Sequence, residues 1–158
     1  MESMILRMEA FQFSEPARER LITGIRLGCM FLFLYTAYAK IVDHDRFLRG
    51  LTRVHFVHGA AMYISWLVPF AEILASVFIL IPQTAKWGLY AFISLMTLFT
   101  GYIISALIWE EKLPCHCGGA IEKLSWTQHL WFNLAFILLA IFALRLINSK
   151  YIFKKHKK

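Results

Sequence analysis

Four long apolar runs, separated by short polar segments, dominate this sequence. They cover residues 21–41, 60–81, 87–109 and 126–147. A helix of about 20 apolar residues crosses a bilayer core of about 30 Å, so each run is long enough to span a membrane. The pattern predicts an all-α membrane protein, an antiparallel bundle of four transmembrane helices.

Residues 43–58, between the first two runs, follow a different pattern. Apolar side chains recur there at roughly helical spacing, and arginines lie among them. The apolar positions are Phe47, Leu48, Leu51, Val54 and Phe56, and the arginines are Arg46, Arg49 and Arg53. One apolar face and one basic face are typical of a helix lying in the membrane interface. We therefore expect a short interfacial helix between the first and second spans.

Composition and charge agree with a membrane protein. The 158 residues are 59% hydrophobic and 17% charged, whereas soluble domains have roughly 45–50% apolar and about 25% charged residues. This length suits a single membrane domain over residues 1–158, with polar tails at 1–14 and 150–158. The net charge of +7 lies largely in the last tail, directly after an apolar run. That position favours contact with anionic lipids and argues against nucleic acid.

The distribution of basic residues predicts the orientation in the membrane. Arginines flank the start of the first span, and the tail after the fourth span is rich in lysine. The positive-inside rule therefore predicts that both termini are cytoplasmic. The segment 43–58 and the segment between the third and fourth spans then share the opposite, periplasmic side.

The reactive side chains of the chain gather in the segment Pro114-Cys115-His116-Cys117-Gly118-Gly119. A proline before the cysteines and two glycines after them predict a tight, non-helical turn. A disulfide across one residue closes a very small ring, and strain makes such a bond easier to reduce. A protonated His116 would favour a thiolate. The pattern favours redox activity of Cys115 and Cys117, with an inert local disulfide as an alternative.

Metal binding is a second alternative for the same turn. Cys115, His116, Cys117 and His129 offer soft ligands that suit copper or zinc. Zinc ligands are usually separated by two or more residues, whereas one residue separates these cysteines. We therefore assign no metal site. Cys29 lies in the first apolar run and is expected to be a packed core thiol.

Glu72 is the ionisable residue of greatest interest inside a predicted span. A carboxylate there is costly unless it is paired, and it is a functional candidate by default. We favour a structural role, in which Glu72 pairs with Arg26 or bonds a neighbouring helix. The alternative is a proton relay or a contact for a substrate or quinone head group, with Arg26, Lys40 and His129. By its position, Lys40 is expected to mark the outer boundary of the first span.

Two glycines of the first span predict a helix contact. Gly24 and Gly28 are four residues apart, a spacing that brings small residues onto one face. This spacing lets another helix approach the first span closely.

Several motifs together resemble the MauE/DoxX group of small bacterial membrane proteins. They are the segment 38–43 followed by Phe47, the segment 69–74, and the Cys-x-Cys-Gly turn. Behind the turn stand Leu124, Trp126, His129, Phe132 and Asn133. The resemblance covers the chain from about Leu21 to Leu146. MauE-like turns commonly read Cys-x-Cys-Phe-Gly, whereas Gly118 stands here in place of the phenylalanine.

The resemblance implies a four-helix bundle in the bacterial inner membrane, related in architecture to vitamin K epoxide reductase-like proteins. It also implies periplasmic thiol–disulfide chemistry with a thioredoxin-like partner, or help in maturing a disulfide-containing protein, as expected of a methylamine utilisation family. On this interpretation Cys115, His116 and Cys117 form the catalytic site of a thiol–disulfide oxidoreductase. The alternatives are a non-enzymatic assembly or docking subunit and a copper- or zinc-handling protein. With two cysteines on the outer side, onward electrons must pass to a quinone or to another protein.

Overall fold

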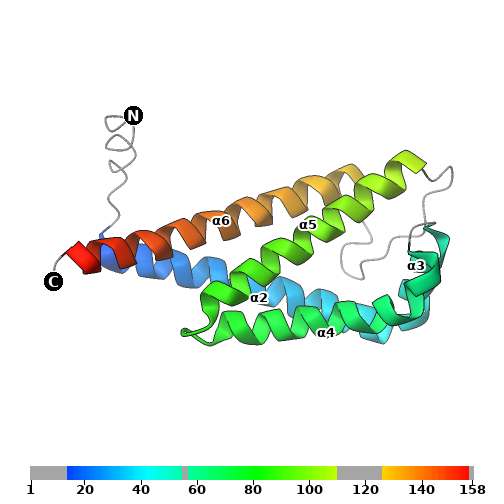
Figure 1. Cartoon of the computed structure of the whole chain (residues 1–158), viewed down its shortest axis with the longest axis horizontal. Helices are drawn as coiled ribbons and strands as arrows, with labels where there is room; N and C mark the ends of the chain where they lie inside the picture. Colours follow the sequence, from blue (N-terminus) through cyan, green and yellow to red (C-terminus); the bar gives the residue numbers. More distant parts are fainter. Residues whose placement is uncertain (1–13, 55–56, 110–125, 157–158) are drawn as a thin grey trace.

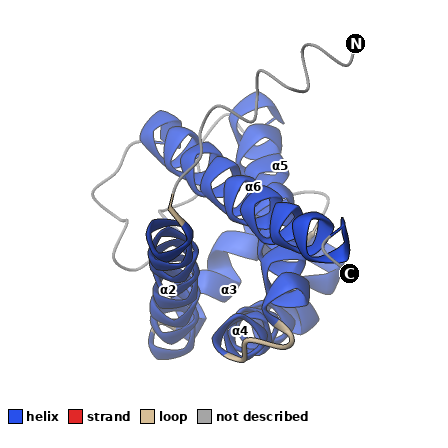
Figure 2. Cartoon of the chain, turned by 90° about the vertical axis from the view of Figure 1, so that its left-hand side faces the viewer, coloured by secondary structure: helices blue, strands red, loops and turns tan. Residues whose placement is uncertain are grey.

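The computed structural model describes residues 14–54, 57–109 and 126–156. These residues form five α-helices and one short 3-10 helix, and the described part of the chain has no strand (Figure 2). The elements are α2 (Glu15–Val42), α3 (His44–Arg53), η2 (His58–Ala60), α4 (Ala61–Leu80), α5 (Ala85–Trp109) and α6 (Trp126–His156). The predicted all-α class is confirmed for this part of the chain.

The four long helices correspond to the four apolar runs. Each is long and apolar enough to cross a membrane, as the sequence predicted. Their ends extend beyond the runs: α2 begins at Glu15, and α6 continues to His156 through much of the predicted polar tail. The start of α2 carries Pro16 in its first turn, but Ser14 makes no side-chain capping hydrogen bond. An ion pair of 2.9 Å between Glu15 and Arg18 stabilises that turn instead.

Figure 1 shows how these helices are arranged. The first turn of α2 and the last turn of α6 lie at the left of the view, and α3 lies at the right, where α2 ends and α4 begins. A short turn at residues 81–84 joins α4 to α5. The helix pairs with the most extensive contacts are α2 with α4, α4 with α5 and α5 with α6. All four long helices therefore contribute to one bundle.

The main core lies among all four long helices. Its buried residues are Cys29, Phe33, Ala75, Ile79, Leu89, Phe92, Met96, Ala140, Ala143 and Leu144. The rings of Phe33 and Phe92 stand 4.3 Å apart at its centre. Cys29 is 1% exposed, which confirms the prediction of a packed core thiol. Several of the buried residues are alanines, because small side chains let membrane helices approach closely.

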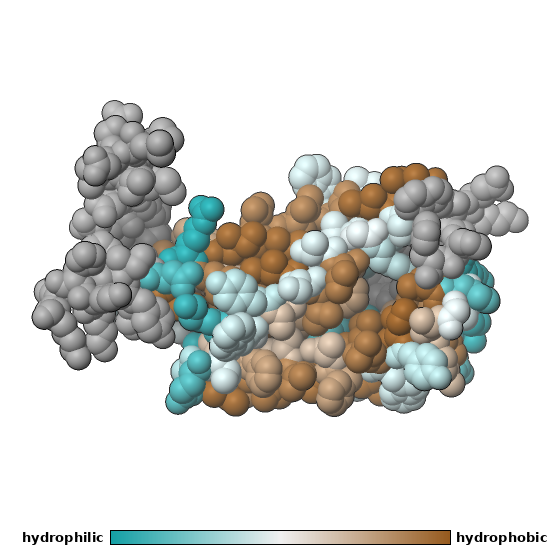
Figure 3. Space-filling view, in the orientation of Figure 1, coloured by the Kyte–Doolittle hydropathy of each residue, from teal (hydrophilic) through white to brown (hydrophobic). Residues whose placement is uncertain are grey.

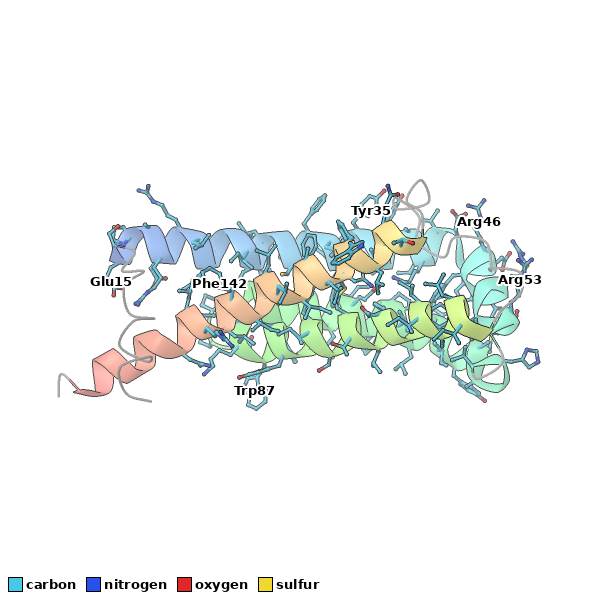
Figure 4. The ribbon with its side chains drawn as sticks, turned by 90° about the horizontal axis from the view of Figure 1, so that it is seen from above. Glu15, Tyr35, Arg46, Arg53, Trp87 and Phe142 are labelled. Atoms are coloured by element: carbon cyan, nitrogen blue, oxygen red, sulfur yellow. The ribbon has the colours of Figure 1, made fainter. Side chains whose placement is uncertain are left out.

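The outer surface of the bundle is largely apolar. Tyr63, Trp87 and Leu138 are among many large apolar or aromatic residues that are more than half exposed. In Figure 3 brown apolar residues cover the middle of the molecule, and teal hydrophilic residues lie toward both ends of this face. Trp87 points away from the bundle in Figure 4. Such a belt suits contact with lipid chains.

The closest helix approach involves a glycine other than the predicted ones. A Cβ atom at Gly88 in α5 would lie 2.5 Å from the backbone nitrogen of Ile79 in α4, so only glycine fits there. Gly24 and Gly28 have nothing within 4 Å of a Cβ position, and both face outward. Within the described residues no helix makes the close approach that the spacing of these two glycines allows.

The helix α3 is amphipathic, as the sequence predicted, but shorter than the segment 43–58. Phe47 and Leu51 are buried against the bundle. Arg46 and Arg53 point outward at the end of the molecule (Figure 4). The helix ends at Arg53, and Val54 adopts an extended conformation.

Candidate functional site

A buried ion pair joins α2 to α4. The ammonium nitrogen of Lys40 lies 2.7 Å from Oε1 of Glu72, and the two side chains are 9% and 1% exposed. Helical side chains lean toward the N-terminus of their helix. Lys40 near the end of α2 therefore leans into the bundle, while Glu72 leans toward the end of α4 that lies beside α3. Each charge is costly to bury alone, and the pair compensates both.

Neighbouring side chains hold the two charges in position. The Thr36 hydroxyl, one turn before Lys40, lies 3.2 Å from both Oε1 of Glu72 and the carbonyl oxygen of Phe33. The ammonium group faces the rings of Phe47 and Phe99, with its nitrogen 5.8 and 5.2 Å from their centroids. Such contacts stabilise a cation in apolar surroundings. The charge of Lys40 is thus shared between one carboxylate and two aromatic faces.

The second carboxylate oxygen of Glu72 has no hydrogen-bond partner among the described residues. This atom, Oε2, is fully buried. Buried polar atoms in proteins are almost always hydrogen-bonded, and an exception points to strain or to function. The pair therefore presents an unused acceptor inside the bundle.

Glu72 and Lys40 are part of the wall of a cavity of about 580 Å³. Most of the wall is apolar and comes from all four long helices and α3. Its apolar residues include Leu32, Phe33, Phe47, Leu51, Ile64, Leu67, Val68, Leu95, Leu98, Phe99 and Phe132. The polar side chains in the wall are Thr36, Lys40, Glu72, Tyr102, His129 and Asn133. A mostly apolar wall with a few polar groups is typical of a ligand-binding pocket of this size.

The cavity reaches the outer surface of the bundle between α4 and α5. Leu67 of α4 and Leu98 of α5 both line it, and they are 62% and 68% exposed. The two helices are in close contact at Gly88 and diverge from there toward α3 (Figure 1). The mouth therefore lies on the apolar belt of the molecule.

The α6 side of the wall is fixed by a polar contact. The side-chain amide of Asn133, which is 5% exposed, donates to the Thr100 hydroxyl of α5 at 3.4 Å. That hydroxyl donates to the carbonyl oxygen of Met96 at 2.8 Å. Hydrogen bonds between membrane helices fix their relative position, so Asn133 holds α6 against α5 beside the cavity.

Comparison with protein families decides which group the chain represents. The family model described as methylamine utilisation protein MauE matches residues 18–146. The chain belongs to the MauE family. Comparisons with curated proteins and with solved structures gave no match. The matched range runs from α2 into α6, so it contains the ion pair, the cavity and the Cys-x-Cys segment.

In this MauE-family bundle the predicted candidates divide into two groups. Glu72, Lys40 and His129 all line the cavity, although the sequence did not predict which of them meet. Lys40 lies two residues before the end of α2 at Val42, and its side chain is buried against Glu72. That it marks the outer boundary of the first span stays a prediction. Of the two structural contacts expected for Glu72, the structure shows the one with a neighbouring helix, made with Lys40 and Thr36 of α2.

Arg26 is the candidate that lies elsewhere. Its guanidinium group donates to the carbonyl oxygen of Ile79 at 2.6 Å and to that of Leu80 at 3.2 Å. These carbonyls end α4 and have no partner within the helix, so Arg26 stabilises that end. The expected pairing of Arg26 with Glu72 is wrong, because Lys40 occupies the carboxylate instead.

The Cys115, His116 and Cys117 candidates lie outside the described residues. Among the described residues no group of three or more histidine, cysteine or acidic side chains is arranged to hold a metal ion. Sequence reasoning missed Thr36 and Phe99 as neighbours of the ion pair. Thr36 lies four residues before Lys40 and so shares its helix face, a signal that could have been used.

Proposed function

We propose that this chain is a thiol–disulfide protein of the bacterial inner membrane. Its Cys115 and Cys117 exchange disulfides with a periplasmic thioredoxin-like partner, or serve the maturation of a disulfide-containing protein. The observation that carries this proposal is a Cys-x-Cys pair between two membrane-spanning helices of a MauE-family chain. The methylamine utilisation role in the family's description fits a maturation factor of this kind.

The proposal includes a membrane arrangement. The four long helices cross the bilayer in alternating directions, and α3 lies in the periplasmic interface with Phe47 and Leu51 toward the bundle. The exposed arginines of α3 support this arrangement, because a basic face can contact lipid head groups. Both termini are then cytoplasmic, and the Cys-x-Cys segment is periplasmic. A membrane-impermeant thiol reagent applied to intact spheroplasts should label reduced Cys115 or Cys117, whereas labelling only after lysis would contradict this orientation.

The exchange needs no chemistry beyond thiols and disulfides. A thiolate of a reduced partner attacks one sulfur of the Cys115–Cys117 disulfide, so an intermolecular S–S bond forms as the internal bond breaks. A second thiolate of the partner then attacks the mixed disulfide, and the partner leaves oxidised. Two electrons have moved to the cysteine pair. His116 stands between the sulfurs in sequence and stabilises the departing thiolate in its protonated form.

Trapping of the mixed disulfide tests this function. Cys115→Ser or Cys117→Ser leaves one cysteine without a neighbour that could release a bound partner. The probe is purified thioredoxin that lacks its second, resolving cysteine and carries thionitrobenzoate on the remaining one. The free thiolate of a single variant displaces thionitrobenzoate and forms a mixed disulfide that neither protein can resolve, so a non-reducing gel should show a cross-linked band for at least one single variant. The Cys115→Ser/Cys117→Ser double variant is the matched control and should show no band, and Cys29→Ala should behave as wild type because its thiol is buried.

The other outcomes distinguish the alternative functions. Absence of any cross-link, together with about one copper or zinc ion per purified chain, would indicate a metal-handling protein. Absence of both would leave an assembly or docking subunit. Either result would overturn the redox proposal.

A further inference from the structure

We propose that the cavity beside Lys40 and Glu72 binds a neutral, lipid-soluble ligand with an oxygen-bearing ring, of the quinone and quinol class. Three observations carry this inference. The cavity opens on the apolar belt, its wall contains a buried ion pair, and one carboxylate oxygen of that pair has no hydrogen-bond partner among the described residues. Each observation narrows the chemistry of the ligand.

The position of the mouth selects a ligand that dissolves in lipid. Leu67 and Leu98 line the cavity and are themselves exposed on the belt between α4 and α5. In the proposed membrane arrangement this surface faces acyl chains, so a molecule enters from the bilayer. Phe47 and Phe99 offer aromatic faces inside, which pack favourably against a flat ring.

The charges select a neutral head. Lys40 and Glu72 compensate one another at 2.7 Å, so the pair has no net charge to balance a charged ligand. An anionic head such as a fatty-acid carboxylate would meet the buried carboxylate of Glu72, and like charges repel. A plain hydrocarbon would leave Oε2 of Glu72 without a hydrogen bond.

The hydrogen-bonding groups select an oxygen-bearing ring. Lys40 has three N–H donors, and Glu72 is its one hydrogen-bonding partner among the described residues. A remaining N–H can donate to a quinone carbonyl oxygen. Oε2 of Glu72 is buried as the side chain stands, and a turn of the carboxylate about its soft terminal torsion would let it accept from the hydroxyl group of the reduced, quinol form. The same two side chains can therefore bind both the oxidised and the reduced form of the ligand. A site for a ligand with one oxidation state would not need both a donor and an acceptor.

The use of this site as an electron acceptor rests on the proposed function. The reduced cysteine pair would lose two electrons and two protons as its S–S bond forms, and the quinone would gain both and become a quinol. Binding itself does not depend on the cysteines. The binding experiment below is therefore also done with the Cys115→Ser/Cys117→Ser double variant, for which we expect unchanged affinity.

Three short-tailed probes with alkyl chains of nine or ten carbons test the ligand class. Decylubiquinone carries a quinone head, decylbenzene carries a ring without oxygens, and decanoate carries a carboxylate. Titration calorimetry of the full chain in nanodiscs, with empty nanodiscs as the blank, should show decylubiquinone binding at least about tenfold more tightly than the other two. About tenfold is the change expected from one hydrogen bond to a charged group.

Three variants locate the site. Leu98→Trp fills the mouth and should weaken decylubiquinone binding at least about tenfold, because the quinone ring can no longer enter or fit in the cavity. Leu138→Trp is the matched control, because Leu138 is 65% exposed on α6 and does not line the cavity. The Lys40→Met/Glu72→Leu double variant keeps the charges balanced and should lose the preference for decylubiquinone over decylbenzene.

The inference is overturned by equal binding of decylubiquinone and decylbenzene to the wild type, which would indicate a pocket for lipid chains only. Tighter binding of decanoate, or equal effects of Leu98→Trp and Leu138→Trp, would also overturn it. Quinone binding without a trapped mixed disulfide would uphold the cavity site and reject the proposed function. A trapped mixed disulfide without quinone binding would uphold the proposed function and reject the cavity site.

Discussion

The Lys40–Glu72 pair leads to a quantitative prediction about the stability of the bundle. The perturbations are Lys40→Met, Glu72→Leu and the two together. Removal of one partner of a buried ion pair costs about 3–5 kcal/mol, because the other charge is left uncompensated. Replacement of both by apolar residues of similar size removes both desolvation penalties. We therefore expect each single variant to lose about 3–5 kcal/mol and the double variant to unfold with nearly the wild-type free energy.

The geometry gives an independent estimate of the coupling between the two residues. Two unit charges at the observed 2.7 Å attract by about 6 kcal/mol when the effective dielectric constant is about 20. The predicted cycle gives a similar value, because two single losses of about 3–5 kcal/mol are almost absent from the double variant. Both estimates therefore predict that Lys40 and Glu72 are strongly coupled, and the rings of Phe47 and Phe99 add to the stabilisation of the cation.

The assay is reversible unfolding in mixed micelles of SDS and a mild detergent, followed by the helical circular dichroism signal. Thr36→Val is the control, because it removes a single hydroxyl beside the carboxylate and should cost about 1 kcal/mol. If the double variant loses as much as the two single variants combined, the side chains are independent and the argument fails. A coupling of less than about 1 kcal/mol would refute it equally, because that is the value of an exposed pair.

The remaining predictions use the same unfolding assay. Gly88→Ala should lower the free energy of unfolding by at least about 1–3 kcal/mol, because the new Cβ would clash with the backbone of Ile79. Gly101 lies in open space, so Gly101→Ala should leave that free energy unchanged or raise it by up to about 1 kcal/mol. Equal effects of the two substitutions would contradict the close contact at Gly88. Arg26→Leu should cost about 1.5–3 kcal/mol by exposing the last carbonyls of α4, and Arg26→Lys, which keeps the charge but not the two-pronged donor, should cost less. Phe33→Ala should cost about 3–5 kcal/mol because Phe33 is 1% exposed in the main core, and a loss below about 1 kcal/mol would show that this core is not packed as described.

The spans of this protein could be predicted from sequence because the bilayer sets their length. About 20 apolar residues are needed to cross the hydrocarbon core, and the chain contains four such runs. Which helices touch could not be predicted in the same way. In a span that is apolar on every side, hydropathy does not distinguish the face toward lipid from the face toward another helix. For this reason Gly24 and Gly28 appeared to be contact residues, although Gly88 has that role.

The candidate site was predicted in part for a related reason. A carboxylate inside an apolar run is conspicuous, so Glu72 could be identified without a structure. Lys40 looked like a boundary residue because it stands three residues from Asp43 in the sequence, and the direction of its side chain is visible only in the bundle. The cavity follows from the divergence of α4 and α5, which no local pattern encodes. The roles of Cys115, His116 and Cys117 stay predictions from sequence and family.

The glycine contact between α4 and α5 also gives the cavity a mechanical property. Phe99 lies eleven residues beyond Gly88 on α5, about 16 Å along the helix axis, so a tilt of about 5° about this fulcrum moves the cavity wall by about 1.4 Å. A change in side-chain volume at the fulcrum is therefore amplified at the far end of the lever. Substitutions at the contact between α4 and α5 would therefore widen or narrow the opening, and so change which ring sizes it admits, without replacing any residue that a ligand touches.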